Sequence, residues 1–413
     1  MPARGLTTRN LHADRAGGPE HGVLHKPVHP SVAFGYADAR ELAEVFQGKR
    51  AGYAYGRQAN PTVAALQHRV TTMEGGAASV AFGTGMAAIA AVALTLLKAG
   101  DHMVSSAYLF GNTNSFFRTL ARFGIEVDFV DATGAAAVAE KIRPQTRIVF
   151  VETIANPVTQ IADLEGIGAL CRERGLLYVV DNTMTSPHLY QPKSAGAGLV
   201  VNSLTKYIGG HGNALGGAVT DTGQFDWSGF ANILDLYRQG DSRDWGLAQI
   251  RKKGLRDMGA SLAPEAAHTL AVGSESLPLR MDQACANAMA LARLCADHPA
   301  VAKVNYPGLP VHPQHQRARS LFRAFGALFS IELAAGINCF DFLNSLEVVV
   351  ASSNLGDTRS LGIPVAHTIY HEMGPRWRQS MGIADSLLRF SIGIEDQADL
   401  LADFSQALAR CGT

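Results

Sequence analysis

The sequence predicts an α/β fold, because short apolar runs alternate with helical stretches between residues 59 and 258. The apolar runs have the length and the β-branched composition of buried strands. The candidate strands are 102–106, 127–131, 147–152, 177–181, 199–204 and 216–220. Apolar strands joined by helices form a mainly parallel sheet covered on both faces, and such a sheet binds ligands beyond the carboxyl ends of its strands.

Helix signals stand before and between these strands. Asn60 is a typical N-cap residue, Pro61 suits the first helical position, and Gly75 ends a run of apolar residues at helical spacing. These signals predict a helix over 61–74. Further helical stretches lie within 84–100, 115–124 and 163–175.

Two segments flank this α/β domain of residues 59–258. Residues 1–58 have few periodic apolar positions and cannot form a core, so we predict an arm that lies on another surface. Residues 259–413 begin with a long helical run that ends near Pro299 and finish with a helix over 397–408. Mixed helix and strand patterns lie between them, which predicts a smaller α+β domain.

Composition narrows the possible partners. The 413 residues include 36 basic and 36 acidic side chains, and this balance argues against nucleic acid and is compatible with oligomerisation. Five scattered cysteines lack the spacing of a metal site, so we expect free thiols, a reducing compartment and no metal. The first residues lack an apolar signal segment, and the stretch Met86–Leu97 is too short to span a bilayer. We therefore expect a cytoplasmic protein without a membrane partner.

Candidate site residues stand at the carboxyl ends of predicted strands or at the helix starts beside them. Gly83, Thr84 and Gly85 precede an alanine-rich helix, where backbone N–H groups can bind a phosphate, although a simple glycine-rich turn has the same pattern. Asp181 ends an apolar strand, where a buried carboxylate needs a cation or several hydrogen-bond donors. A helix-capping aspartate is the simpler alternative at this position.

Lys206 follows the next predicted strand. A desolvated lysine can form a Schiff base with an aldehyde, and the alternative is a lysine that reaches solvent from the strand end. Asn156, just beyond the strand 147–152, can present its amide to a ligand oxygen. A phosphate site, an acid for a pyridinium nitrogen and a Schiff-base lysine together indicate pyridoxal 5'-phosphate.

At this point the chain resembles the Cys/Met-metabolism pyridoxal-phosphate enzymes. The resemblance runs from about residue 25 to the C-terminus, through the ordered motifs "YGRQANPT", "GTGMAAI", "ETIANP", "DNTMTSP", "SLTKYIGGHGNALGG", "NYPGL" and "RFSIGIED". It implies the fold-type-I architecture, with a mainly parallel seven-stranded sheet, a smaller C-terminal α+β domain and an N-terminal arm. It also implies a homotetramer, built as a dimer of active dimers in which the arm reaches the neighbouring subunit.

The resemblance also assigns roles to individual residues. Lys206 would hold the cofactor as a Schiff base, and Asp181 would pair with its pyridinium nitrogen. Arg389 would bind the substrate carboxylate. The remaining cofactor contacts implied in this way are Gly85, Met86, Phe110, Thr183, Ser203 and Thr205, with Tyr55 and Arg57 supplied by a neighbouring subunit. Asn156 and Asn354 complete the implied substrate site, and His211 is expected to be structural.

Some positions depart from the family pattern. Phe110 stands where the family usually places a tyrosine, so ring stacking is kept but a phenol that assists the leaving group is lost. The chain resembles O-succinylhomoserine sulfhydrylases at this position, since they also have phenylalanine. Lys206 or Tyr55 would then have to carry out more of the proton transfers. The predicted catalytic residues are therefore Lys206, Tyr55 and Phe110. Ile369 replaces a usual histidine, and Ser353 replaces a glutamate of members that handle cystathionine.

These features favour one reaction within the family. The runs "YIGGHGNALGG" and "SNLGDTRSL" resemble O-acetylhomoserine sulfhydrylases, the second with Asn354 where lyases usually carry serine. We expect replacement of the γ-substituent of an O-acylated homoserine by sulfide or a thiol, giving homocysteine or a thioether. The alternatives are elimination by a methionine or cystathionine γ-lyase-like enzyme, giving 2-oxobutyrate and ammonia, and a non-catalytic pyridoxal-phosphate protein.

Overall fold

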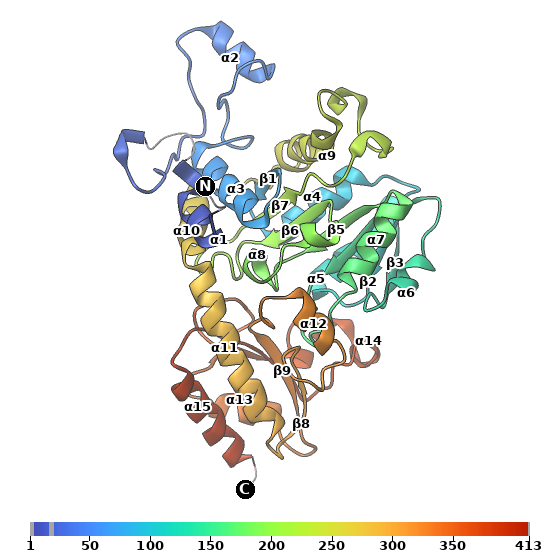
Figure 1. Ribbon diagram of the computed structural model, residues 1–413, viewed down its shortest axis with the longest axis vertical. Helices are drawn as coiled ribbons and strands as arrows, with labels where there is room; N and C mark the ends of the chain where they lie inside the picture. The colour runs from blue at the N-terminus through green and yellow to red at the C-terminus, as the bar shows by residue number, and fades with distance from the viewer. Residues whose placement is uncertain (1–3, 16–19, 412–413) are drawn as a thin grey trace.

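A computed structural model describes residues 4–15 and 20–411, and two β-sheets organise the chain (Figure 1). The larger sheet has seven strands in the order β1-β7-β6-β5-β4-β2-β3. Its strands are β1 (Ala78–Phe82), β2 (His102–Ser106), β3 (Glu126–Val130), β4 (Thr146–Glu152), β5 (Leu177–Asp181), β6 (Leu199–Ser203) and β7 (Gly217–Asp221). Strand β7 runs antiparallel to both of its neighbours and the other pairs are parallel, which confirms the predicted mainly parallel sheet.

Helices cover both faces of this sheet, as the strand alternation requires. In β4, Val149 and Val151 belong to one core cluster with residues of α3 and α7, whereas Ile148 and Phe150 belong to another with residues of α4 and α5. The helices of this part of the chain are α3 (Pro61–Glu74), α4 (Gly85–Leu96), α5 (Gly111–Thr119), α6 (Ala135–Ala139), α7 (Leu164–Arg174), α8 (Ser186–Leu189) and α9 (Trp245–Gln249). A π-helix over Ile250–Asp257 follows α9.

The predicted helix over 61–74 is confirmed with both of its end signals. The Asn60 side chain accepts a hydrogen bond from Thr62 N–H at 2.9 Å, and Pro61 is the first helical residue. At the other end Gly75 has a φ of 62°, a left-handed conformation that glycine adopts without strain.

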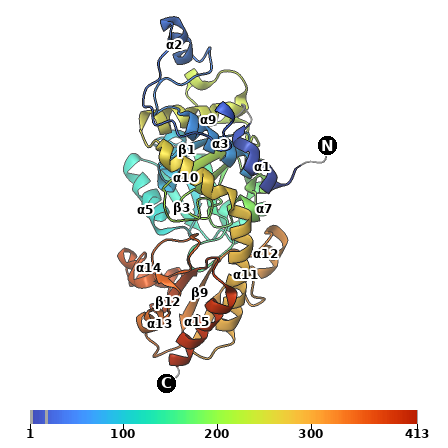
Figure 2. The same ribbon diagram turned by 90° about the vertical axis from the view of Figure 1, so that its left-hand side faces the viewer.

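The second sheet lies at the other end of the molecule (Figure 2). It has five strands in the order β10-β11-β12-β9-β8: β8 (Val301–Asn305), β9 (Leu328–Leu333), β10 (Val350–Ala351), β11 (Leu361–Pro364) and β12 (Leu387–Ser391). Helix α11 (Leu277–Ala296) runs along the molecule from the first sheet to the second (Figure 1). The other helices of this region are α10 (Pro264–Glu275), α12 (His315–Leu321), α13 (Cys339–Ser345), α14 (Pro375–Ser380) and α15 (Gln397–Arg410).

The N-terminal segment contains more regular structure than the sequence predicts. Helix α1 (Leu6–His12) packs against α3 and α10 of its own chain. Helix α2 (Ala39–Phe46) has no buried residue and stands clear of the rest of the molecule (Figures 1 and 2). Residues 1–3 and 16–19 of the predicted arm lie outside the described residues.

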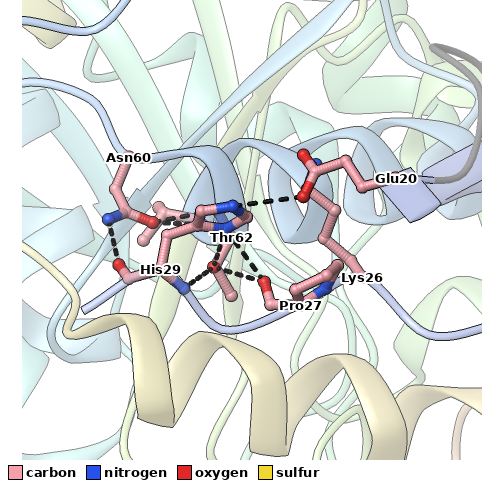
Figure 3. Close-up of polar contacts among 7 residues, drawn as sticks. Glu20, Lys26, Pro27, His29, Asn60 and Thr62 are labelled. Atoms are coloured by element: carbon pink, nitrogen blue, oxygen red, sulfur yellow. Dashed lines mark hydrogen bonds and ion pairs between the residues drawn. The ribbon is translucent and has the colours of Figure 1, made fainter. Parts of the chain in front are cut away.

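Residues 20–29 fasten this segment to the start of α3 (Figure 3). Glu20 pairs with Lys26 at 2.5 Å and with His29 at 3.2 Å, and the hydrogen bond from Lys26 lowers the pKa of Glu20. Asn60 donates to the main-chain oxygen of His29 at 2.7 Å, and Thr62 donates to that of Pro27 at 3.0 Å. Within the described ranges, no helix has the length and apolar character to cross a membrane.

Candidate active site

A cavity of about 350 Å³ lies beyond the carboxyl ends of β4, β5 and β6, where ligands of parallel sheets bind. Strand β12 of the second sheet closes another side of it through Arg389. Eleven of the predicted site residues line this cavity: Gly85, Met86, Phe110, Asn156, Asp181, Thr183, Ser203, Thr205, Lys206, Asn354 and Arg389. The strand-end positions predicted from the sequence therefore meet at one place.

The N-terminus of α4 forms one wall. Its N-cap residue, Thr84, accepts the N–H of Ala87 at 3.0 Å, and the helix begins at Gly85. First-turn N–H groups have no acceptor inside their own helix, so they face the cavity as donors. A Cβ atom at Gly85 would lie 2.8 Å from Cβ of Ser203, and only glycine permits this approach of helix and strand. The wall suits a phosphate group.

Asp181 lies at the end of β5 and is 9% exposed. The N–H of Thr183 donates to its carboxylate at 2.9 Å, and burial raises the pKa of Asp181 to about 6. Among the described residues no cation pairs with it. A buried carboxylate in this state is the complement of a cationic ring nitrogen.

Lys206 and Asn354 are joined across the cavity. Nζ of Lys206 donates to Oδ1 of Asn354 at 2.7 Å. Burial, and then the positive charge of Arg389, lower the pKa of Lys206 to about 8. A tenth or so of the lysine is therefore a neutral amine at neutral pH, the form that attacks an aldehyde.

Arg389 comes from the centre of β12 and is 1% exposed. Its Nη2 donates to the main-chain oxygens of Ser353 at 3.2 Å and of Asn354 at 2.8 Å, and its Nε has no hydrogen-bond partner within the described part of the chain. No acidic side chain of the described residues forms an ion pair with it. This guanidinium can bind an incoming carboxylate with a fork of donors.

Apolar side chains form the remaining wall, which includes Phe110, Ile369 and Leu215. Asn156 also lines the cavity. Its side-chain oxygen finds no hydrogen-bond partner among the residues that the structure describes, while its main-chain oxygen accepts the hydroxyl of Tyr370 at 2.7 Å. His211 does not line the cavity, and its ring contacts the main-chain oxygen of Gly209 at 2.7 Å.

Two predicted residues lie outside this cavity. Tyr55 is 40% exposed, and the guanidinium of Arg57 lies 5.3 Å from the centre of its ring. Arg57 also donates to the main-chain oxygen of Arg256. Within one chain these side chains do not meet Lys206, as expected if they serve a neighbouring subunit.

Glu152 is a cavity residue that is not predicted from the sequence. It ends β4 beside Asp181 and accepts the N–H of Phe110 at 2.7 Å. The sequence carries the signal in the adjacent strands "RIVFVE" and "LYVVD", each of which ends in an acid. Parallel pairing places these two ends side by side.

The residues present fit pyridoxal phosphate. The helix start can hold a phosphate, Asp181 lacks the cation that a ring nitrogen supplies, and Lys206 has a lowered pKa. The guanidinium of Arg389 can then bind the carboxylate of an amino acid. The site is therefore that of a pyridoxal-phosphate enzyme acting on amino acids.

Comparison with known proteins defines the family. The family model described as Cys/Met metabolism PLP-dependent enzyme matches residues 7–409. The L-methionine gamma-lyase of Pseudomonas putida is 36% identical over 407 residues, which are 98% of this chain and 97% of that protein. The O-acetyl-L-homoserine sulfhydrylase 1 of Thermus thermophilus is 36% identical over 421 residues, covering 97% of this chain and 99% of that protein.

A solved structure agrees with these relatives. It is a putative O-acetylhomoserine (thiol)-lyase from Campylobacter jejuni that carries a pyridoxyl-lysine phosphate, with a TM-score of 0.92, 29% identity and coverage of 98% and 100% of the two chains. The chain belongs to the Cys/Met-metabolism PLP-dependent enzyme family. It is an enzyme with the fold-type-I architecture, and its cofactor is pyridoxal 5'-phosphate.

Proposed function

We propose that this enzyme replaces the acyl group of an O-acylated homoserine with a sulfur nucleophile, giving homocysteine from sulfide or a thioether from a thiol. The acyl group that suits the cavity best is a small uncharged one such as acetyl. The observation that carries the proposal is Phe110, together with the lack of any tyrosine among the described residues lining the cavity.

The leaving group explains why this observation matters. An acyl ester leaves as a carboxylate, whose conjugate acid has a pKa of about 4, so it needs no proton from the protein. A thioether leaves as a thiolate, whose conjugate acid has a pKa of about 8.5 or more, and its departure gains from a general acid such as a phenol. A cavity walled by Phe110 within its own chain therefore favours the ester.

The cofactor would be held at its phosphate and at its ring nitrogen. The backbone of Gly85 and Met86 and the hydroxyls of Ser203 and Thr205 would hold the phosphate, and Asp181 would hold the ring nitrogen. When bound, pyridoxal phosphate supplies an electron sink that makes the Cα–H bond of an amino acid acidic.

The remaining residues would bind the substrate and move its protons. Arg389 takes the α-carboxylate, because its Nε is unpartnered and its fork faces the cavity. Lys206, with a pKa of about 8, takes up and returns protons near neutral pH, and Asn354 orients its amine through the 2.7 Å hydrogen bond. Asn156 offers its free side-chain oxygen to the substrate ammonium group.

The charge of the lining supports a short, uncharged substrate side chain. Among the described lining residues, Lys206 and Arg389 are the cations. Lys206 is already assigned to proton transfer and Arg389 to the α-carboxylate. A succinyl carboxylate would find no further cationic partner among the lining residues that the structure describes. Phe110, Ile369 and Leu215 instead offer apolar contact to an acetyl group.

Methionine γ-lyase-like elimination is the second candidate. It is favoured by relatives named L-methionine gamma-lyase in Pseudomonas putida and in Fusobacterium nucleatum subsp. polymorphum, at 36% and 35% identity over 98% of this chain. In that case the thiolate would receive its proton from Lys206 or from a tyrosine of another subunit.

Product analysis distinguishes the two reactions. The purified enzyme is incubated with O-acetylhomoserine or methionine, each with and without sulfide, and homocysteine and 2-oxobutyrate are quantified. We expect homocysteine from O-acetylhomoserine only when sulfide is present, and little 2-oxobutyrate from methionine. Rapid release of 2-oxobutyrate from methionine, without synthesis of homocysteine from the ester, would favour elimination.

We further propose that the arm of residues 1–58 completes the site of a neighbouring subunit in a homotetramer, beside a domain of residues 59–258 and another of residues 259–413. The free face of α2 and the exposure of Tyr55 support this arrangement. Lys206→Ala and Arg57→Ala variants, each inactive alone, should regain activity when mixed and allowed to exchange subunits. A mixture that stays inactive despite exchange would contradict shared sites.

A further inference from the structure

Two carboxyl groups share the wall of the active-site cavity. Glu152 and Asp181 end adjacent parallel strands and are direct partners in the register of β4 and β5. Their side chains point to the same face of the sheet, because Phe150 and Val179, two residues earlier in each strand, both pack in the cluster with α4. Both residues line the cavity and both are buried.

The two carboxyl groups have different hydrogen bonds. Asp181 accepts the backbone N–H of Thr183 at 2.9 Å, and the Thr183 side chain also favours the ionised form by lowering the pKa of Asp181 against the effect of burial. Glu152 accepts one bond, from the N–H of Phe110 at 2.7 Å. Two buried like charges on neighbouring strands do not both ionise, and the group with more donors keeps the charge.

Among the described residues, no basic side chain forms an ion pair or hydrogen bond with Glu152. Lys206 and Arg389 line the same cavity, but Lys206 donates to Asn354 and Arg389 donates to main-chain oxygens. Among the described residues, the titratable groups that interact with Glu152 are the Asp181 carboxylate and the buried hydroxyl of Tyr370, which donates to the main-chain oxygens of Leu109 and Asn156. Tyr108 borders a small cavity beside Glu152, and its hydroxyl donates to Asp131. Burial, and then the charge of Asp181, raise the pKa of Glu152 well above its usual range.

We propose that Glu152 is a positioning residue that stays protonated, fixing Phe110 through its carbonyl oxygen and leaving the single negative charge of the carboxyl pair on Asp181. The positioning role of Glu152 follows from the start of α5. Phe110 is the N-cap residue of this helix, and its own side chain makes no capping hydrogen bond. Glu152 therefore fixes the backbone of the residue whose ring lines the cavity.

The net charge of the Glu152–Asp181 pair affects the binding of the cofactor and of the substrate. The cofactor phosphate and the substrate carboxylate are both anions, so a second negative charge beside Asp181 would weaken their binding. A neutral Glu152 avoids this repulsion. It also leaves Asp181, which carries the Thr183 hydrogen bonds, as the group that pairs with the ring nitrogen.

Glu152→Gln and Glu152→Ala separate the two contributions, with Glu140→Gln on the exposed end of α6 as a matched control. Glutamine keeps a carbonyl acceptor and is neutral like the protonated acid, whereas alanine removes the acceptor. The full-length apoprotein is titrated with pyridoxal phosphate at pH 7 and pH 9, and the cofactor dissociation constant is measured by absorption. Thermal unfolding of the same apoproteins is followed from pH 5 to pH 9.

The cofactor titration has distinct expected results. Glu152→Gln should bind the cofactor within about threefold of the parent at pH 7, and its affinity relative to the parent should rise with pH, because ionisation of Glu152 in the parent weakens binding and glutamine does not ionise. Glu152→Ala should bind at least tenfold more weakly at both pH values. Equal weakening by glutamine and alanine would show that an ionised carboxylate is required and would overturn the proposal, as would full affinity in the alanine variant.

The unfolding data give an independent readout. Glu152 has a folded-state pKa above its unfolded value, so the stability that it contributes is complete below the unfolded pKa and is lost as pH rises through the folded pKa. The unfolding temperature of Glu152→Gln should therefore rise relative to the parent between pH 5 and pH 9, while Glu140→Gln should follow the parent. A constant difference across this range would refute a protonated Glu152. Both readouts are independent of which sulfur reaction the enzyme performs.

Discussion

Replacing Asn354 with aspartate should move the titration of Lys206 to higher pH. The Asn354 amide oxygen accepts the lysine at 2.7 Å, and aspartate puts a charged oxygen of the same size in its place. A hydrogen bond to a charged group stabilises by about 1.5–3 kcal/mol, against about 1 kcal/mol for a neutral one, and a change of about 1.4 kcal/mol corresponds to one pH unit. The pKa of Lys206 should therefore rise from about 8 by about one pH unit.

The assay is the rate at which the apoprotein captures pyridoxal phosphate, measured by absorption between pH 6 and pH 10. The neutral amine is the reactive form, so Asn354→Asp should be about tenfold slower than the parent near pH 7 and should approach it near pH 10. Asn338→Asp makes the same change at the N-cap of α13, far from Lys206 in the chain and outside the cavity, and should leave the profile unchanged. An inflection in Asn354→Asp at the same pH as in the parent would refute this reasoning.

Three further changes address other walls of the cavity. Arg389→Lys keeps the charge but loses the fork, so KM for the amino acid should rise by about 10–100-fold while the cofactor dissociation constant changes little; comparable losses in both would contradict a substrate role. Phe110→Tyr restores a phenol, and elimination from methionine should increase about tenfold or more in kcat, as general acid catalysis permits; unchanged elimination would count against the leaving-group argument. Gly85→Ala would place its Cβ 2.8 Å from that of Ser203, so cofactor affinity should fall at least tenfold, and a parent-like affinity would mean that the phosphate is held elsewhere.

Local signals in the sequence were sufficient to predict much of the fold. Asn60, Pro61 and Gly75 mark both ends of α3, and six apolar runs correspond to β2 through β7. Strand β1 was missed, because "ASVAF" contains two alanines and pairs antiparallel with the distant β7. Helix α2 was also missed, since its side chains find no core within the chain.

The site shows the same division between local and long-range information. Asp181 and Lys206 were predicted because each follows an apolar strand, and the parallel sheet brings these ends together. Glu152 was missed although it has the same placement, since its importance depends on the register that sets it beside Asp181. The contact of Lys206 with Asn354 joins residues 148 positions apart and requires both sheets. The predicted role of Tyr55 and Arg57 does not appear within a single chain, because the site that they are predicted to complete belongs to another subunit.

The measurement that tests the proposed reaction most directly is the ratio of kcat/KM for O-acetylhomoserine with sulfide to kcat/KM for methionine. If the cavity beside Phe110 is built for a leaving group that needs no proton, this ratio should exceed about 100, which corresponds to about 2.7 kcal/mol of transition-state stabilisation. A ratio at or below one would contradict the account and would identify the enzyme as a methionine γ-lyase.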